Sequence, residues 1–302
     1  MASNTKQLVI IGGGPAALAA ALYSARAGIE TQVFERANIG GLLGEIAKLD
    51  NYPGYAGAGS ELASQMQRQA EAAGVQISYG ECSAVRQTDG HAGFELIIDG
   101  VAVRAGAVLV ATGAEPKPLP FVVTPPVSYC ALCDGARAKG QDVVVVGGAN
   151  AAVQESLYLA NLAKSVTIIT HSALKADYAL REQLAKTPNI KLIEHQEPTP
   201  EFLNQFAYVF VCIGRTPATS FLRNLPILDQ DGYILTNLEA ATALSETTAT
   251  PSETSIRKPT HMTALPGLFA AGDVRAASVH QVIAAAGDGA VAATEIAQFN
   301  NL

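Results

Sequence analysis

Residues 8–35 read LVIIGGGPAALAAALYSARAGIETQVFE. An apolar run, a glycine-rich turn, an Ala- and Leu-rich segment and a second apolar run follow one another, which predicts a strand, a helix and a second strand. The turn has the spacing GxGxxA, and its glycines let the backbone approach a pyrophosphate at the positive end of the helix. Glu35 stands 23 positions after Gly12, where a carboxylate accepts hydrogen bonds from ribose hydroxyls. The stretch therefore predicts an adenine dinucleotide site.

This strand–turn–helix–strand pattern occurs twice in the chain. A shift of 135 positions places Gly12 on Gly147, Ala17 on Ala152 and Val33 on Ile168, without a gap. Such self-similarity predicts an internal repeat of one supersecondary unit. We therefore expect an α/β protein with two nucleotide-binding folds, each built on a parallel sheet.

A pair of cysteines stands between the two copies, in the stretch Cys130-Ala131-Leu132-Cys133-Asp134-Gly135. Two thiols three positions apart can close a disulfide ring, which makes a two-electron switch. The alternatives are half of a zinc site or two core cysteines. Zinc would need two more ligands, and the other cysteines, Cys82 and Cys212, stand in apolar strand-like runs, where we expect core residues. The flanking nucleotide folds favour the redox interpretation.

The composition fits a globular protein of two domains. The chain has 302 residues, of which 49% are hydrophobic and 16% are charged, so a large core is possible and disorder is not expected. Its net charge of −7 argues against nucleic acid or an anionic membrane as the main partner. The polar start of the chain predicts no signal peptide, and no apolar run reaches membrane-spanning length. A paired CxxC without an export signal fits the cytoplasm, where disulfides are usually catalytic.

The charge is unevenly distributed along the chain. From Lys117 to Asp229, 10 basic and 9 acidic residues give +1, whereas the remainder has 10 basic and 18 acidic residues and carries −8. A docking partner that is itself acidic would therefore meet less repulsion at the middle segment.

The remaining segments predict one domain inserted into another. Five prolines crowd one short stretch, which resists helix and central strand and predicts an inter-domain connector: Pro116, Pro118, Pro120, Pro125 and Pro126. Residues 239–258 are rich in Ser, Thr and Ala and predict a long exposed loop. Residues 268–271 predict a strand, and residues 281–299 predict a closing helix. We assign residues 1–115 and 230–302 to one domain and residues 116–229 to the inserted one.

Taken together and in this order, these motifs resemble the low-molecular-weight thioredoxin reductase family over nearly the whole chain. The resemblance implies FAD as the cofactor, a thioredoxin-like protein as the substrate, a homodimer, and two Rossmann-like domains with the redox domain inserted into the FAD domain. It also implies a set of FAD-binding residues: Gly12, Gly14, Pro15, Ala16, Glu35, Gly41, Leu42, Asn51, Thr112, Gly113, Gly272, Asp273, His280 and Gln281. As alternatives, Asp273 could cap the segment that follows it, and His280 could be an ordinary surface histidine.

The resemblance also implies roles for the redox motif. Cys133 would face the flavin and receive its electrons, and Cys130 would be the thiolate that attacks the disulfide of the partner. Asp134 would act as a general acid toward a leaving thiolate; its alternative role is to cap the following helix. One pair of cysteines cannot reach flavin and partner at once, so the family rotates the inserted domain, and the proline-rich connector could permit this rotation.

The second nucleotide fold departs from the family pattern. Ala149 replaces the middle glycine of the turn, so that a Cβ obstructs the approach to a pyrophosphate, and Thr170 stands where Glu35 stands in the first copy. The family places two arginines after the second strand to hold the 2′-phosphate of NADPH, whereas this chain has His171 and Ser172. We therefore expect a different electron donor, as in those members that accept electrons from ferredoxin.

Three alternatives stay open from the sequence. The protein could be an NADPH-dependent thioredoxin reductase with a weakened nucleotide site. It could be an oxygen-dependent dithiol oxidase, although the usual active-site context of those enzymes differs from this one. It could also be a redox-sensing flavoprotein that binds a partner through residues 239–258.

Overall fold

The computed structural model describes residues 7–46, 48–88, 93–129, 131–237, 260–276 and 278–299. The chain divides into two compact units, Met1–Ala114 with Pro217–Leu302 and Glu115–Thr216. We call the first the N/C unit and the second the inserted unit. The N/C unit is interrupted by the inserted unit, which is the chain order of an inserted domain.

A five-stranded parallel sheet forms the centre of the N/C unit. Across the sheet its strands are β17 (Leu268–Ala270), β9 (Ala107–Val110), β1 (Gln7–Ile11), β2 (Glu30–Glu35) and β5 (Gln76–Tyr79). The strand β9 is buried at every residue, as expected for a parallel strand that is covered on both faces.

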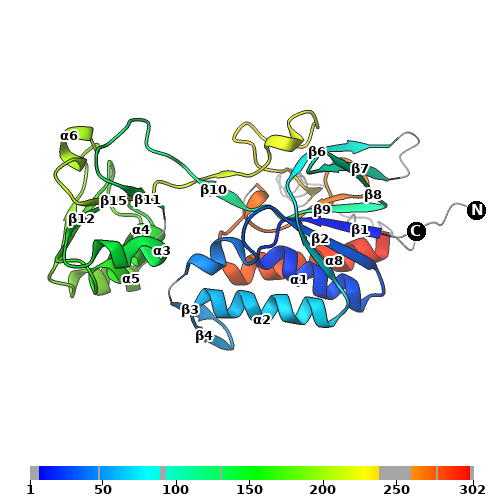
Figure 1. The fold of residues 1–302 in the computed structure, drawn as a ribbon, viewed down its shortest axis with the longest axis horizontal. Coiled ribbons are helices and arrows are strands. Elements are labelled where there is room, and N and C mark those ends of the chain that lie inside the picture. The colour runs from blue at the N-terminus through cyan, green and yellow to red at the C-terminus, as the bar shows by residue number, and fades with distance from the viewer. Residues whose placement is uncertain are drawn as a thin grey trace, which may run out of the picture. The chain divides into compact units, whose positions relative to one another are not determined.

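Different elements cover the two faces of this sheet (Figure 1). Helices α1 (Pro15–Arg26), α2 (Gly59–Ala72) and α8 (Val282–Phe299) lie along one face, and their alanines share a core with Leu8 and Ile10. The antiparallel strands β6 (Cys82–Gln87), β7 (Phe94–Ile98) and β8 (Val101–Ala105) cover the other face and share a core with Val9 and Ile11. Consecutive residues of β1 serve opposite cores because side chains alternate along a strand.

Shorter elements complete the N/C unit. They are η1 (Gly41–Glu45), the hairpin of β3 (Leu49–Tyr52) and β4 (Tyr55–Gly57), η4 (Ser220–Leu222) and η5 (Gly272–Val274).

The inserted unit follows the same plan. Its parallel sheet has the order β11 (Val127–Ser128), β15 (Tyr208–Val211), β12 (Asp142–Val146), β13 (Ser165–Ile169) and β14 (Ile190–Ile193). Its helices are α3 (Ala131–Asp134), η3 (Gly135–Ala138), α4 (Asn150–Leu159), α5 (Tyr178–Ala185) and α6 (Pro200–Leu203). Where the chain passes between the units, β10 (Ala114–Pro116) and β16 (Arg215–Pro217) form a two-stranded sheet.

Four neighbouring strands of each large sheet agree in order and in register: β9, β1, β2 and β5 in the N/C unit, and β15, β12, β13 and β14 in the inserted unit. In the N/C unit Gln7 pairs with Glu30, and in the inserted unit Asp142 pairs with Ser165. Both residues of the pair are displaced by 135 positions, the shift that relates the two sequence motifs. The internal repeat and the α/β fold of two Rossmann-like domains are therefore confirmed.

The structure corrects two expectations about the domain boundaries. The return to the N/C unit begins at Pro217 and not at residue 230, because Leu222 and Ile227 pack into the core beneath the antiparallel sheet. The proline-rich stretch is not a connector over its whole length. From Glu115 onward the chain belongs to the inserted unit, where Leu119 and Phe121 pack beside its sheet.

The predicted loop 239–258 lies outside the described residues. In the part of the chain that the structure describes, no helix combines the length and the apolarity needed to cross a membrane.

Candidate active site

The turn between β1 and α1 has a backbone that requires glycine at its first position. Gly12 has φ +107°, and a Cβ there would run into the carbonyl group of Ala111 at the end of β9. Gly14 is different, since its φ of −76° is ordinary and a Cβ would meet no atom of the described residues within 4 Å. Space is therefore left open at the N-terminus of α1, where Pro15 is the first helical residue and the N–H groups of the first turn lack intrahelical acceptors.

Glu35 lies beside this turn, as the sequence spacing predicts. Its Oε2 accepts a hydrogen bond from the N–H of Gly13 at 2.6 Å, and its Oε1 accepts one from the N–H of Ala37 at 2.8 Å. A carboxylate has about four acceptor positions. The two bonds orient the Glu35 carboxylate and leave acceptor positions for ribose hydroxyls.

The start of α1 is enclosed by segments from the other end of the chain. A Cβ on Gly272, the first residue of η5, would lie 2.9 Å from the Cβ of Ala16. A Cβ on Gly289 of α8 would run into the carbonyl group of Ala16. Helices α1 and α8 accordingly lie side by side (Figure 1), and three predicted cofactor-binding positions, Ala16, Gly14 and Gly272, belong to one locality.

Two further pairs of predicted residues meet in the N/C unit. Asn51 Nδ2 donates to Gln281 Oε1 at 3.0 Å, although the two residues are 230 positions apart. His280 Nδ1 lies 3.6 Å from Asp273 Oδ2, and the His280 ring lies against Tyr233 with centroids 6.3 Å apart. His280 is therefore an exposed histidine that also contacts Asp273 and Tyr233, and Asp273 lies within η5 and not at its N-cap.

The other predicted cofactor-binding residues lie in η1 and just after β9. Gly41 opens η1, and a Cβ on it would lie 3.8 Å from the Cα of Gly14, with Leu42 following in the same short helix. Thr112 Oγ1 donates to the carbonyl oxygen of Ala218 at 2.8 Å, and Gly113 follows. The hydroxyl of Thr112 therefore fastens the end of β9 to the returning chain, and contact of Thr112 and Gly113 with a cofactor stays a prediction.

The redox motif is described only in part. Cys130 and the side chain of Cys133 lie outside the described residues, so their pairing stays a prediction. Asp134 is held on both sides: its Oδ2 accepts from Ser128 Oγ at 2.7 Å, and its Oδ1 lies 3.3 Å from Arg137 Nη1. Within the described residues its side chain makes no capping hydrogen bond to η3. Asp134 therefore stands at the N-cap position of η3, while its carboxylate bonds to Ser128 and Arg137.

Cys82 is buried in the core beneath the antiparallel sheet, and Cys212 is partly buried beside the core of the inserted unit. Burial raises the pKa of the Cys82 thiol to about 11. Burial, together with the nearby Glu155, raises the pKa of Cys212 well above its usual value. Thiols in this state are poor nucleophiles, so both cysteines act as packing residues, as we predicted.

The turn of the inserted unit keeps the backbone of the first turn. A Cβ on Gly147 would run into the carbonyl group of Cys212, which corresponds to the contact between Gly12 and Ala111. A Cβ on Gly148 would lie 2.5 Å from Thr170 Oγ1. Thr170 therefore takes the place that Glu35 takes beside Gly13, as the 135-residue shift predicts.

The segment after β13 makes the same backbone contact as the segment after β2 in the N/C unit, but its side chains make different contacts. Lys175 N donates to the carbonyl oxygen of Gly148 at 2.6 Å, just as Gly40 N donates to Gly13 at 2.8 Å. At the start of α4, however, Asn150 Nδ2 donates to Asp177 Oδ2 at 2.7 Å, and Asp177 N donates to Asn150 Oδ1 at 2.8 Å. This reciprocal pair joins the first residue of the helix to a carboxylate.

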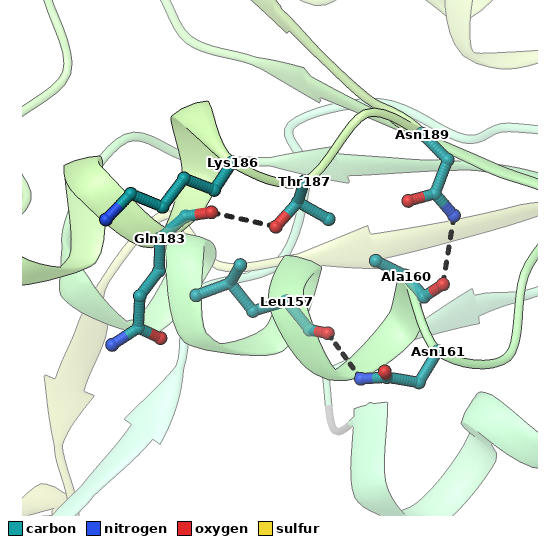
Figure 2. Close-up of a pocket in the computed structure, with 7 residues that line it drawn as sticks. All are labelled: Leu157, Ala160, Asn161, Gln183, Lys186, Thr187 and Asn189. Atoms are coloured by element: carbon teal, nitrogen blue, oxygen red, sulfur yellow. Dashed lines mark hydrogen bonds between the residues drawn. The ribbon is translucent and has the colours of Figure 1, made fainter.

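A cavity of about 460 Å³ lies elsewhere in the inserted unit, at the ends of α4 and α5 (Figure 2). Figure 2 shows its polar groups closing helix ends, with Asn161 donating to the carbonyl of Leu157 and Asn189 to that of Ala160. The cavity lies at the amino end of the strands, whereas parallel α/β sheets bind ligands at the carboxyl end. It contains no predicted site residue and is separate from the nucleotide-binding turn.

The comparisons with known proteins agree with one another. A family model described as pyridine nucleotide-disulphide oxidoreductase matches residues 6–199. A thioredoxin reductase of Listeria monocytogenes is 33% identical over 97% of this chain and 93% of its own length. The chain belongs to the thioredoxin reductase family. The crystal structure of Lactococcus lactis thioredoxin reductase in the FR conformation superposes with a TM-score of 0.83 at 30% identity, covering 98% of this chain and 99% of that one. The thioredoxin reductase of T. acidophilum gives a TM-score of 0.81 at 28% identity, covering 97% and 98%.

As a member of the thioredoxin reductase family, the chain is an FAD-dependent disulfide oxidoreductase. The first turn fits this cofactor, because Gly14 leaves room for a pyrophosphate and Glu35 keeps free acceptor positions for a ribose. Residues around the start of α1, with Gly41, Asn51 and the segment from Gly272 to Gln281, would hold FAD. When bound, FAD supplies the exchange of two electrons with a disulfide.

Sequence analysis missed an ionic network inside the N/C unit of this thioredoxin reductase relative. Arg275 is 5% exposed and His261 is 4% exposed, and both face Asp288 of α8. Arg275 donates to Asp288 Oδ2 from Nε at 3.0 Å and from Nη2 at 2.9 Å, and His261 Nε2 lies 3.4 Å from Asp288 Oδ1. His261 Nδ1 lies 3.6 Å from Glu295 Oε2. The sequence signal for this network is an aspartate between two glycines in an Ala-rich helix.

The network shifts the pKa values of His261, Asp288 and Glu295. Burial alone would lower the pKa of His261, but the carboxylates of Asp288 and Glu295 outweigh burial and raise it. Burial would raise the pKa values of the two carboxyl groups, but His261 lowers both and Arg275 further lowers that of Asp288. The network is therefore ionised in mildly acidic solution.

We expect this network to make thermal stability depend on pH. The contribution of protonated His261 is fully present below its unfolded pKa of about 6.5 and is lost as pH rises through the raised folded pKa. Heating the protein between about pH 6 and 9 should therefore show Tm falling with pH, and His261→Gln should reduce the fall by about 2–4 °C. His171→Gln, at an exposed histidine, is the control. An equal fall in wild type and His261→Gln would contradict this role.

Proposed function

We propose that this protein carries electrons from a donor other than NADPH, through FAD and a Cys130–Cys133 disulfide, to the disulfide of a thioredoxin-like protein. The names of its relatives support the thioredoxin-like substrate. Ferredoxin or another donor of low potential is the proposed source, and a homodimer is the proposed assembly. Thioredoxin has a potential near −270 mV, so the donor must lie at or below about that value.

The observation that carries the proposed donor is the position of Thr170. Its side chain is 3% exposed and lies against Gly148, where the first turn has a carboxylate for the ribose. A buried threonine offers one neutral hydroxyl oxygen and cannot present the two charged oxygens with which Glu35 can hold a pair of ribose hydroxyls. Ala149 adds a Cβ at the position where Gly14 leaves open space. The backbone of the nucleotide fold is thus retained while both groups that grip a dinucleotide are replaced.

The pair Asn150–Asp177 opposes a dinucleotide electrostatically. The N-terminus of a helix favours anions because its N–H groups are free and its dipole is positive there. The carboxylate of Asp177 accepts a hydrogen bond from Asn150, the first residue of α4. A negative charge therefore already lies beside the N-terminus of this helix. A bound pyrophosphate would have to approach that carboxylate, which disfavours binding.

In the proposed reaction, the Cys130–Cys133 bond accepts two electrons and two protons and becomes two thiols. The Cys130 thiolate attacks the disulfide of the partner, which breaks that S–S bond and forms a mixed disulfide. Cys133 then attacks the Cys130 sulfur, restores the internal disulfide and releases the partner as a dithiol. We assign Asp134, oriented by Ser128 and Arg137, as the group that protonates the leaving thiolate.

Anaerobic stopped-flow reduction of the flavin tests the donor directly. We expect NADH and NADPH to bleach the flavin at least about 100-fold more slowly than reduced ferredoxin does, a difference in activation free energy of about 2.7 kcal/mol. Dithionite should bleach the flavin completely, which shows that it is reducible. Fast bleaching by micromolar NADPH would refute the proposed donor. The double variant Ala149→Gly/Asp177→Ala, which reopens the second turn, should accelerate reduction by NADPH.

A further inference from the structure

The carboxylate of Asp288 lies next to the predicted cofactor-binding turn that begins at Gly272. Asp288 Oδ2 accepts a hydrogen bond from the backbone N–H of Gly272 at 3.1 Å. The next residue of α8, Gly289, and Gly272 itself both lie against Ala16 at the start of α1. Asp288 therefore links the turn that contains Asp273 to helix α8. Helix α8 in turn packs against the N-terminal end of α1, where we predict that the phosphates bind.

The carboxylate is itself held in place from two sides. Arg275, at the end of the same turn, donates twice to Asp288 Oδ2, and His261 faces Oδ1. The backbone of Arg275 also donates to the carbonyl oxygen of Gly272 at 3.0 Å. The turn from Gly272 to Arg275 is thus closed by its own backbone, and the side chain of Asp288 bonds to both ends of it from α8.

We propose that Asp288 is a positioning residue for FAD, which keeps Gly272 and Asp273 in the orientation that retains the cofactor. It does so through the Gly272 N–H and the Arg275 guanidinium, without contact with the cofactor. The inference rests on the assignment of Gly272 and Asp273 to the FAD site and is independent of the electron donor. Loss of Asp288 releases the turn from α8, so FAD leaves faster even where the unit stays folded.

The variants must separate this role from general stability. Asp288→Ala leaves the buried Arg275 without its carboxylate, which is strongly destabilising. The double variant Arg275→Met/Asp288→Leu removes both charges together and leaves the Gly272 N–H without its acceptor. Asp288→Asn keeps one oxygen that can accept from Gly272 but loses the charge toward Arg275. Glu295→Gln is the matched control, since Glu295 bonds to Thr260 and His261 and not to the turn.

The measurement is the rate at which FAD leaves the purified holoprotein, followed by flavin fluorescence after dilution, with Tm recorded for each variant. We expect the double variant to release FAD about tenfold faster, equivalent to about 1.4 kcal/mol, and Asp288→Asn about threefold faster. Glu295→Gln should lower Tm and leave the release rate unchanged. Unchanged release in the double variant, or equal acceleration in Glu295→Gln, would overturn the proposal. If the double variant does not fold, Asp288→Asn decides by the same comparison with the control.

Discussion

Replacing Cys133 with serine is expected to stop the transfer of electrons from the flavin to a disulfide substrate. A serine hydroxyl cannot form a disulfide with Cys130, so the proposed two-electron acceptor is lost. We expect the rate to fall by at least about 1,000-fold, corresponding to about 4 kcal/mol in activation free energy. The measurement is anaerobic: protein reduced with one equivalent of dithionite is mixed with a thioredoxin disulfide, and flavin reoxidation and new thiols are followed.

The matched control for this experiment is Cys212→Ser. Cys212 is the third cysteine of the inserted unit, and its raised pKa makes it a poor nucleophile. Its replacement should change the rate by less than about threefold. Substantial turnover in Cys133→Ser would contradict the role assigned to Cys133. A loss of turnover in Cys212→Ser would show that the electrons take a different route.

The second large effect is expected from Gly14→Ala. The new Cβ meets no atom of the described residues within 4 Å, and the φ of −76° suits alanine, so the protein should fold with an unchanged Tm. The methyl group would instead enter the space in which a pyrophosphate approaches the backbone. We expect FAD affinity to fall about 100-fold, or about 2.7 kcal/mol, measured by titrating the apoprotein with FAD.

Gly12→Ala provides the contrast within the same turn. Its Cβ would run into the Ala111 carbonyl group, and its φ of +107° is unfavourable for alanine. This change should lower Tm by several degrees, since it strains the junction of β1 and β9 whether or not FAD is bound. Equal FAD affinity in Gly14→Ala and wild type would contradict the assignment of this turn to the pyrophosphate.

The second turn of the chain already carries the equivalent of Gly14→Ala, because Ala149 stands at that position. One scaffold therefore presents both forms of the turn, with Glu35 beside the open form and Thr170 beside the obstructed one. Under the proposed function, the two positions that suit FAD in the first unit are the ones that exclude NADPH from the second unit.

Several tertiary features could not be predicted because their partners are distant in the chain. Asn51 and Gln281 are 230 positions apart, and no local pattern relates them. The apolar residues between the prolines after Pro116, such as Leu119 and Phe121, decide that this stretch packs in the inserted unit. Proline density describes what the backbone cannot form and does not reveal what the intervening side chains bury.

The sequence by itself determined the two nucleotide folds and their shared register. It also determined that Thr170 stands in the second unit at the position that Glu35 has in the first. These features depend on hydrophobic runs and glycine positions that repeat with a constant shift, which local physical rules can detect. Only the tertiary structure decided the boundary at Pro217, the orientation of Asp134 by Ser128, and the link from Asp288 to Gly272. Each of these depends on which groups meet after folding, and the free energy of burying a charge or an apolar side chain depends on those neighbours.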